Sequence, residues 1–379
     1  MSNTLTNLIP TIYAAKDVVL RELTGFIPAV TMDASAEMAA KDQTIRYPVV
    51  PAIAAADIAP AATGPDPSAT TQGSGTMSIS KVRSSTFFWE AEEQKGLGSL
   101  YGKILQDQFT QAMRTLVNEV EADLAALYIK ASRAYGTAGT TPFASTLADP
   151  AQVRKILADN GAPMSDLQLV IDTTAGAALR TLGQLVVPNT TSGVRNGVLL
   201  DLHGFAVRES AQVKTHTKGT ASGYLVDLTA GYAAGSTTIH VDTGTGTMVA
   251  GDVLSNTKTG RDTNKYVVAT GHAGDADQDV VLAAPGTKIA WVNNDPVAVA
   301  ANYTANLAFS RSAIHLLMRV PAMPEGGDAA DDVTVITDPE TGISFQVAMY
   351  RQRRRVAYEV GLAWGVSAVK TNAIAILLG

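Results

Sequence analysis

The feature of this sequence that most restricts its fold is a long helical pattern between residues 100 and 135. Charged side chains such as Lys103, Asp107 and Glu119 fall outside a single apolar stripe. That stripe consists of Leu105, Phe109, Ala112, Met113, Leu116, Val120, Leu124, Leu127 and Ala131. At 1.5 Å per residue the helix would be ~50 Å long. Because so long a stripe needs cover along its whole length, we expect a mixed α and β fold built on this spine.

The segment 44–90 precedes this helix and is unusual in composition. Strand-like residues at 44–49 and 77–89 flank residues 52–75, which are mostly Ala, Pro, Gly, Ser and Thr. Such a stretch cannot cover a core of its own. Two arms of ~20 residues at ~3.3 Å per residue would reach at most ~65 Å. It is either a disordered linker or an extended two-stranded loop ordered by a neighbouring subunit, and the flanking strands favour the second interpretation.

The remaining segments alternate between helix and strand. Apolar spacing predicts helices at 3–25, 149–161, about 174–185 and 303–322, a strand at 167–171, a hairpin at 197–210 and strands within 333–369. Between residues 213 and 300 the sequence pattern changes to short strand-like runs separated by Gly, Asn, Asp and Pro, with no helical period. This block is typical of a small antiparallel barrel or sandwich, inserted into the mixed domain.

Composition favours a protein that meets other protein over much of its surface. The chain has 379 residues, enough for two or three lobes, and 46% of them are hydrophobic. Only 17% are charged, below the ~25% of typical soluble domains. The net charge of −6 argues against sequence-independent DNA binding, although an acidic wall can still enclose DNA.

Targeting signals and cysteine chemistry are not predicted. The absence of cysteine excludes disulfides and thiolate metal sites and fits a reducing cytoplasm. The first twenty residues have neither a basic start nor a continuous apolar core, so no signal peptide is expected. No run of ~18 uncharged apolar residues predicts a membrane span.

Short catalytic motifs give no support for an enzyme. Asp242-Thr243-Gly244 matches the motif of aspartic proteases, but that chemistry needs two such loops, and Gly244 and Gly246 explain the stretch as a turn. The five histidines, at 203, 216, 240, 272 and 315, are scattered and form no HExxH. Phosphate-loop, dinucleotide and nucleophile-elbow motifs are absent from the sequence. We therefore predict no catalytic, metal-binding or cofactor-binding residues.

Two charged clusters remain as candidate contact residues. Arg351, Arg353 and Arg355 would share one face of a strand, with Arg354 on the other. The cluster could be a nucleic-acid patch or could pair with carboxylates of adjacent subunits, and the acidic stretch 328–332 favours pairing. The second cluster is predicted to be a charged hairpin tip, either solvated or in contact with a neighbour, and consists of Lys258, Arg261, Asp262 and Lys265.

The order of segments resembles the major capsid (coat) proteins of tailed bacteriophages, whose fold is shared with encapsulins and the herpesvirus capsid floor. The likeness is greatest to podovirus-type coat proteins with a β-barrel insertion domain. It covers essentially the whole chain and includes three stretches of text: GFAVRESAQV (204–213), NLAFSRSAIHLLMRVPAMPEGG (306–327) and ETGISFQVAMYRQRRRVAYEVGLAWGVSAVKTNAIAIL (340–377).

The resemblance implies an α+β fold with a definite division of the chain. It assigns an N-terminal arm (1–43), an extended loop (44–90), a peripheral-domain spine helix (91–149) and a first axial part (150–212). An inserted β-barrel (213–300), a second axial part (301–335) and C-terminal strands (336–379) follow. Pro65, Asp66 and Pro67 at the loop tip would then contact the next subunit, together with the two charged clusters.

The resemblance also implies a function and partners. The chain would assemble into hexamers and pentamers of an icosahedral shell around a double-stranded DNA phage genome, in the host bacterial cytoplasm, and would reside in the virion capsid. Its partners would be itself, a separate scaffolding protein, a portal protein and a decoration protein, with no membrane and no sequence-specific DNA contact. Some relatives crosslink through a loop Lys, which this loop tip lacks. The alternatives are an encapsulin-like compartment shell and an aspartic protease using Asp242.

Overall fold

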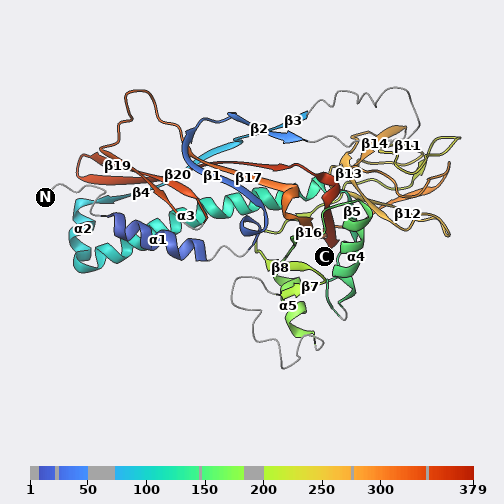
Figure 1. Ribbon diagram of the computed structural model, residues 1–379, viewed down its shortest axis with the longest axis horizontal. Helices are drawn as coiled ribbons and strands as arrows, with labels where there is room; N and C mark the ends of the chain where they lie inside the picture. Colours follow the sequence, from blue (N-terminus) through green and yellow to red (C-terminus); the bar gives the residue numbers. More distant parts are fainter. Residues whose placement is uncertain are drawn as a thin grey trace, which may run out of the picture.

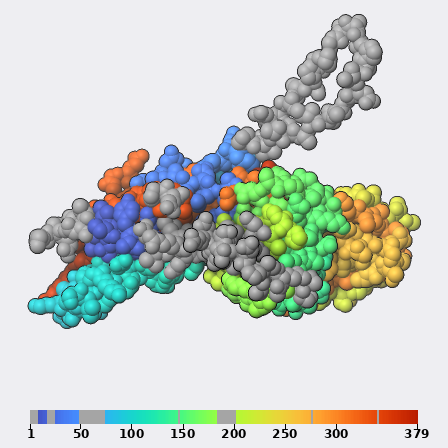
Figure 2. Space-filling view, turned by 60° about the horizontal axis from the view of Figure 1, so that its bottom comes forward, coloured from blue at the N-terminus to red at the C-terminus, as the bar shows by residue number. Residues whose placement is uncertain are grey.

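A computed structural model of the chain describes residues 8–21, 25–49, 73–144, 147–182, 200–274, 277–338 and 341–379. Its described α-helices are α1 (Ile9–Arg21), α2 (Ala91–Leu97), α3 (Tyr101–Ala125), α4 (Ala148–Asp159) and α5 (Thr173–Thr181). Short 3-10 turns are found at Ile27–Ala29, Gly98–Leu100, Ala126–Lys130, Arg311–Ala313 and Thr371–Ala373. The molecule is elongated, with a sheet and long helix at one end and a β-barrel at the other (Figures 1 and 2).

The helix α3 is the predicted spine, and it buries the predicted stripe. Leu105, Phe109, Met113 and Leu116 are among its buried residues. The helix α1 packs along it, and strands of a sheet cover it from the other side (Figure 1). The spine ends at Ala125 and not near residue 135, because the following residues pair elsewhere: the Ser132 amide donates to the Ile374 carbonyl at 2.9 Å, which draws the chain into a strand.

The sheet over α3 contains six strands in the described residues: β1 (Thr31–Ala39), β4 (Lys81–Glu90), β17 (Ile314–Pro321), β18 (Asp332–Thr337), β19 (Ser344–Gln352) and β20 (Arg355–Ala368). The long strand β20 pairs with β4, β19 and β17, so it is the sheet's organising strand. On β4, Phe87 packs edge-on against Phe109 of the spine at 5.0 Å, while the next residue, Phe88, points away and is exposed.

Residues 303–322 are two strands, so the predicted helix there is wrong. They form β16 (Tyr303–Ser310) and β17, which lie in different sheets. The strand β16 runs between β6 and β21, and β17 runs between β1 and β20, so both edges of each strand are hydrogen-bonded. Successive side chains of both strands are buried, which means that both faces are covered as well. A strand buried on both faces has a nearly continuous apolar sequence, which loses the alternation that marks a half-exposed strand.

A second sheet forms the middle of the molecule, in the order β5-β21-β16-β6-β8-β7. Its strands are β5 (Arg133–Tyr135), β6 (Leu167–Ile171), β7 (Leu200–Leu202), β8 (Phe205–Glu209) and β21 (Ile374–Leu378), with β16. The predicted hairpin around Gly204 is confirmed as β7 and β8, and Gly204 has a φ of 83°. One hydrophobic core runs from α1 and α3 through both sheets to α4, so these elements form a single body.

The predicted barrel is confirmed as a closed ring within the described residues. Its strands are β10 (Tyr224–Val226), β11 (Thr238–Asp242), β12 (Val253–Asn256), β13 (Lys265–Thr270), β14 (Gln278–Leu282) and β15 (Pro296–Val299). The pairs β10–β11, β11–β14, β14–β13, β13–β12, β12–β15 and β15–β10 are all antiparallel and close the circle. The barrel encloses its own core around Tyr224, Tyr266 and Trp291.

The chain is thus of the mixed α and β class with a closed β-barrel. The division into arm, loop, peripheral and axial parts stays a prediction, and strand pairing crosses two of its boundaries. The strand β4 lies in the predicted loop segment 44–90 but pairs with β20. Within the predicted axial segment 301–335, β16 belongs to the middle sheet whereas β17 and β18 belong to the sheet over α3.

Candidate assembly surfaces

The base of the predicted extended loop is fixed to the sheet over α3. The strands β2 (Thr44–Val49) and β3 (Gly73–Ser78) pair antiparallel, with Val49 opposite Gly73. A small separate core holds this hairpin on the sheet, consisting of Ala39, Met77, Ile79, Leu317 and Ala363. Residues 50–72, including the predicted contact residues Pro65, Asp66 and Pro67, lie outside the described residues. Their contact role stays a prediction.

The attachment of this hairpin requires a glycine on β20. A Cβ added at Gly365 would lie 2.0 Å from the Ser78 carbonyl oxygen, and backbone atoms cannot yield as a flexible side chain would. Beside it, the Ser80 amide donates to the Trp364 carbonyl at 3.0 Å. The two oxygens of Asp123 on the spine then accept from the Trp364 indole at 2.9 Å and from Lys81 at 2.8 Å. Hairpin base, sheet and spine are therefore joined.

The charged stretch 258–265 is a hairpin loop between β12 and β13, but Asp262 is not part of an exposed tip. Its side chain is 1% exposed and lies in the barrel core. It accepts from the Tyr266 hydroxyl at 2.5 Å, the Trp291 indole at 3.0 Å, and the amide and side chain of Asn264 at 2.9 and 2.6 Å. Burial and this carboxylate raise the pKa of Tyr266, which keeps its phenol a donor. Asp262 is a core acceptor, because the loop folds inward.

The cations of the same loop lie over another buried carboxylate. Lys258 and Arg261 are 3.6 and 3.9 Å from Oδ1 of Asp295, whose residue is fully buried. The other oxygen of Asp295 accepts from the Asn256 side chain at 2.8 Å and the Val292 amide at 3.0 Å. Burial opposes ionisation, but these hydrogen bonds and the two cations hold the pKa of Asp295 below its usual range. Lys258 and Arg261 remain partly exposed, so they can still face a neighbour.

Lys265 lies at a joint between the barrel and the body. The start of β13 pairs with β5, with Lys265 opposite Ala134 and Tyr266 opposite Arg133. The Lys265 ammonium donates to the Gly136 carbonyl, and its burial lowers its pKa. Arg133 is buried and donates to the side chain of Asn264 at 3.2 Å on the barrel side and to that of Asn160 at 2.8 Å on the body side. This joint is an interaction within the chain.

A second joint forms where the chain enters and leaves the barrel. The strand β9 (Thr215–His216) pairs with the start of β16, with His216 opposite Tyr303. The buried His216 ring is 2.9 Å from both the Asp252 carboxylate and the Tyr128 hydroxyl. Tyr303 donates to the Gly251 carbonyl at 2.6 Å. Sequence reasoning missed both joints, since their partners lie far apart along the chain and form no motif.

A third joint ties the N-terminal segment to the spine. Glu121 of α3 is 5% exposed and accepts from the Phe26 amide at 2.9 Å, the Ile27 amide at 2.7 Å and the Ser210 hydroxyl at 3.0 Å. Desolvation raises the pKa of Glu121, and the three hydrogen bonds oppose that shift without cancelling it. One side chain therefore connects three segments of the body.

The arginine cluster lies at a hairpin turn, so the predicted shared strand face is wrong. In the β19–β20 pairing, Arg351 is opposite Val356 and Gln352 is opposite Arg355, which leaves Arg353 and Arg354 as the two turn residues. Arg354 has a φ of 60°, a left-handed backbone conformation that residues other than glycine adopt mainly in turns. Arg355 places its guanidinium 5.2 Å above the Phe88 ring. All three candidate arginines are exposed at this turn, and their contact role stays a prediction.

Beside this hairpin, a shallow pocket of about 190 Å³ opens on the sheet over α3. Pro321, Met323 and Pro324 form part of its wall. The Tyr350 hydroxyl lies 2.7 Å from the Asp328 carboxylate and 3.0 Å from the Glu359 carboxylate, and it can donate to only one of them at a time. Burial and these carboxylates raise the pKa of Tyr350. The lining also includes Arg83, so the pocket holds two carboxylates and one guanidinium.

The motif Asp242-Thr243-Gly244 stands at the end of β11. Thr243 has a φ of 57°, and a Cβ at Gly244 would lie 2.2 Å from the Tyr224 ring. Both facts agree with a turn packed against the barrel. No helix within the described residues is long and apolar enough to cross a membrane.

No family model matches this sequence, and no curated protein matches it either. Solved structures do match the fold. They include the capsid of cyanophage P-SCSP1u, at 11% identity and a TM-score of 0.45, over 92% of this chain and 86% of that one. The mature capsid of bacteriophage PhiM1 is 11% identical with a TM-score of 0.45, over 92% of this chain and 85% of that one. The virus-like particle of Pyrococcus furiosus is 10% identical with a TM-score of 0.42, over 96% of each chain. Two of these structures are phage capsids and one is a virus-like particle, and the likeness is one of fold.

Proposed function

We propose that this chain is a structural major capsid protein that assembles with copies of itself into hexamers and pentamers of an icosahedral shell. The shell would enclose the double-stranded DNA genome of a tailed bacteriophage. The proposal rests on the chain's own geometry, above all on the fixed base of the β2–β3 hairpin.

This hairpin base is the observation that carries the proposal. Its two strands leave the sheet side by side, at Val49 and Gly73, and between them the sequence has few large side chains. A segment of that composition adds nothing to its own core, yet its base has a dedicated apolar cluster and backbone contacts too close for any side chain at Gly365. We take so firm a base beneath this segment as support for a loop that contacts another subunit.

The rest of the molecule suits a wall component. One core spans α1, α3 and both sheets, and three polar joints fix the barrel and the N-terminal segment to that body. Obligate interfaces between shell subunits bury on the order of 2,000–5,000 Å², which demands broad neutral surfaces and suits the low charged fraction. The acidic balance suits a container that does not adhere to DNA.

The partners follow from the same proposal. A separate scaffolding protein would direct curvature, a portal protein would occupy one vertex, and a decoration protein would bind the finished shell. Assembly would take place in the host bacterial cytoplasm, and the mature chain would reside in the virion.

Electron microscopy tests the proposal directly. The expressed chain, imaged by negative stain with and without a co-expressed scaffolding protein, should give closed shells or sheets of hexamers. Only monomers under every condition would contradict it. Shells that form and close without scaffold and never take up DNA would favour the encapsulin-like alternative. Proteolysis that disappears in Asp242→Asn would instead support the protease.

Deletion of residues 55–72 tests the role assigned to the loop. The β2–β3 pairing and the apolar cluster beneath it remain in this variant, so the monomer should keep its circular dichroism and its unfolding midpoint while assembly is lost. The control is Gly96→Ala in α2, whose added methyl group meets open space and which should assemble normally. Normal shells from the deletion variant would show that the loop has no part in assembly.

A further inference from the structure

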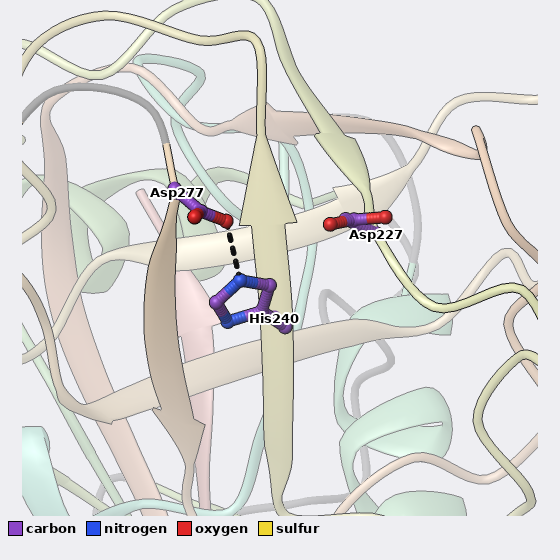
Figure 3. Close-up of side chains that lie close together, drawn as sticks. All are labelled: Asp227, His240 and Asp277. Atoms are coloured by element: carbon purple, nitrogen blue, oxygen red, sulfur yellow. Dashed lines mark hydrogen bonds and ion pairs between the residues drawn. The ribbon is translucent and has the colours of Figure 1, made fainter.

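Four polar side chains gather on the outer face of the barrel, across three neighbouring strands. His240 of β11 stands directly opposite Asp279 of β14 in the strand register. On the other side of β11, the Asp227 amide at the end of β10 donates to the His240 carbonyl at 2.9 Å, which places Asp227 beside the histidine. Asp277 precedes Asp279 by two residues and so points to the same face. Figure 3 shows Asp227 and Asp277 on either side of the imidazole.

The distances make this a possible set of metal ligands. The carboxylates of Asp227 and Asp277 and a nitrogen of His240 lie within 4.8 Å of one another. His240 Nε2 is 2.6 Å from Asp277, and its Nδ1 is 2.6 Å from Asp279. Coordination at ~2.0–2.2 Å from the metal to each ligand places the ligand atoms ~3–3.5 Å from one another. Asp277 would therefore move back from Nε2 by ~0.5–1 Å and Asp227 would move closer, which side chains on the outer face can do by small rotations.

Asp279 has the position of a supporting residue. A histidine that binds a metal through one nitrogen usually donates its other N–H to a carboxylate, which fixes the tautomer and the ring orientation. Asp279 on Nδ1 does this, and it orients Nε2 toward Asp277, to which the protonated Nε2 donates at 2.6 Å while no metal is bound.

The barrel core does not include this cluster. The barrel core is built from the opposite faces of the same strands, through Val226, Ile239, Val241 and Val280. Three carboxylates around one imidazole leave excess negative charge, and like charges on adjacent strands are destabilising. Among the ion pairs of the described residues, Asp277 and Asp279 pair with His240. A bound dication would neutralise the excess and connect the strands.

We propose that Asp227, His240 Nε2 and Asp277 form a divalent cation site for Zn²⁺ or a similar metal, with Asp279 orienting the histidine. One nitrogen and two oxygens suit such borderline ions better than Ca²⁺ or Mg²⁺, which prefer oxygen alone. Water completes the coordination on the exposed side, and binding displaces the proton on Nε2 to solvent. The site stands independently of the proposed function.

Zinc titration of the purified, unassembled full-length chain tests this site. Isothermal calorimetry at neutral pH should give one saturable site per chain, and Asp277→Asn and Asp227→Asn should each weaken it by ~10–100-fold. Asp279→Asn should weaken it too, although Asp279 does not touch the metal. Zn²⁺ should also raise the unfolding midpoint of the native chain and leave that of His240→Ala unchanged.

The matched control is Asp242→Asn, two residues along the same strand, which should bind zinc as the native chain does. Equal circular dichroism without metal will show that the variants are folded, as expected for positions none of which is buried. Absence of saturable zinc binding overturns the proposal. Binding that survives unchanged in His240→Ala or Asp277→Asn overturns it as well, because the ion would then lie elsewhere.

Discussion

Replacement of Asp262 by alanine should destabilise the barrel strongly. The carboxylate accepts hydrogen bonds from Tyr266 and Trp291. Both donors are at most 1% exposed, so water cannot replace the carboxylate as their partner. An orphaned buried donor costs ~1–3 kcal/mol, so two of them amount to ~2–6 kcal/mol. Asn264 is partly exposed and adds little, because solvent can replace its partner. We expect a loss of about 4 kcal/mol in the free energy of unfolding.

Urea unfolding followed by tryptophan fluorescence measures this loss, and hydrogen exchange of the peptides over 224–299 shows where it falls. The matched control is Thr259→Ala in the same hairpin loop, which is exposed and should change the free energy by no more than ~0.5 kcal/mol. A loss below ~1 kcal/mol for Asp262→Ala would refute the reasoning. In that case the carboxylate would have to be free for contacts with another subunit, as its place in a charged stretch of sequence suggests.

Two further substitutions test the joints of the body. Because the pKa of Glu121 is raised, the folded protein holds the proton of this carboxyl group more tightly than the unfolded chain does. The contribution of Glu121 to the free energy of unfolding is therefore complete below its ordinary pKa of 4.5, and it declines as the pH rises through the pKa of the folded state. In urea unfolding, the stability lost in Glu121→Ala should be larger near about pH 4 than near about pH 7, and a gap that widens with pH would contradict this. Gly365→Ala should lower the free energy of unfolding by ~1–3 kcal/mol, because the added methyl group overlaps the Ser78 carbonyl. The control is Gly96→Ala in α2, where the methyl group meets open space, and it should leave the free energy unchanged or raise it by ~0.5–1 kcal/mol. Equal effects in thermal unfolding would show that the close approach at Gly365 is not needed.

The sequence predicts local structure well where one face of an element is exposed. The stripe of α3 and the short barrel strands were recognisable because polar residues mark their outer sides. At 303–322 this marker is missing: Leu307, Ala308 and Phe309 of β16 and Leu316, Leu317 and Met318 of β17 are all buried. An apolar run of that length has spacings of three and four by chance, so helix and strand cannot be separated without knowledge of the neighbouring strands.

Charged residues were the weaker part of the prediction, since charge alone does not reveal direction. Asp262 and Lys265 occur in one charged stretch, yet the first points into the barrel core and the second to the body. The arginine cluster was predicted to lie on one strand, but Arg353 and Arg354 form a turn between two strands. The group around His240 could not be found in advance because its members come from three strands and meet only through register.

The two attachments of the barrel have a mechanical consequence. If the barrel were connected only where the chain enters at β9 and leaves at β16, it would swing on a two-stranded hinge. The additional pairing of Lys265 and Tyr266 with β5 lies at a second point, so the hinge has a strut. A load applied at the outer end of the barrel is therefore shared between two rows of backbone hydrogen bonds and passes into the middle sheet, and the barrel cannot tilt without shearing one row.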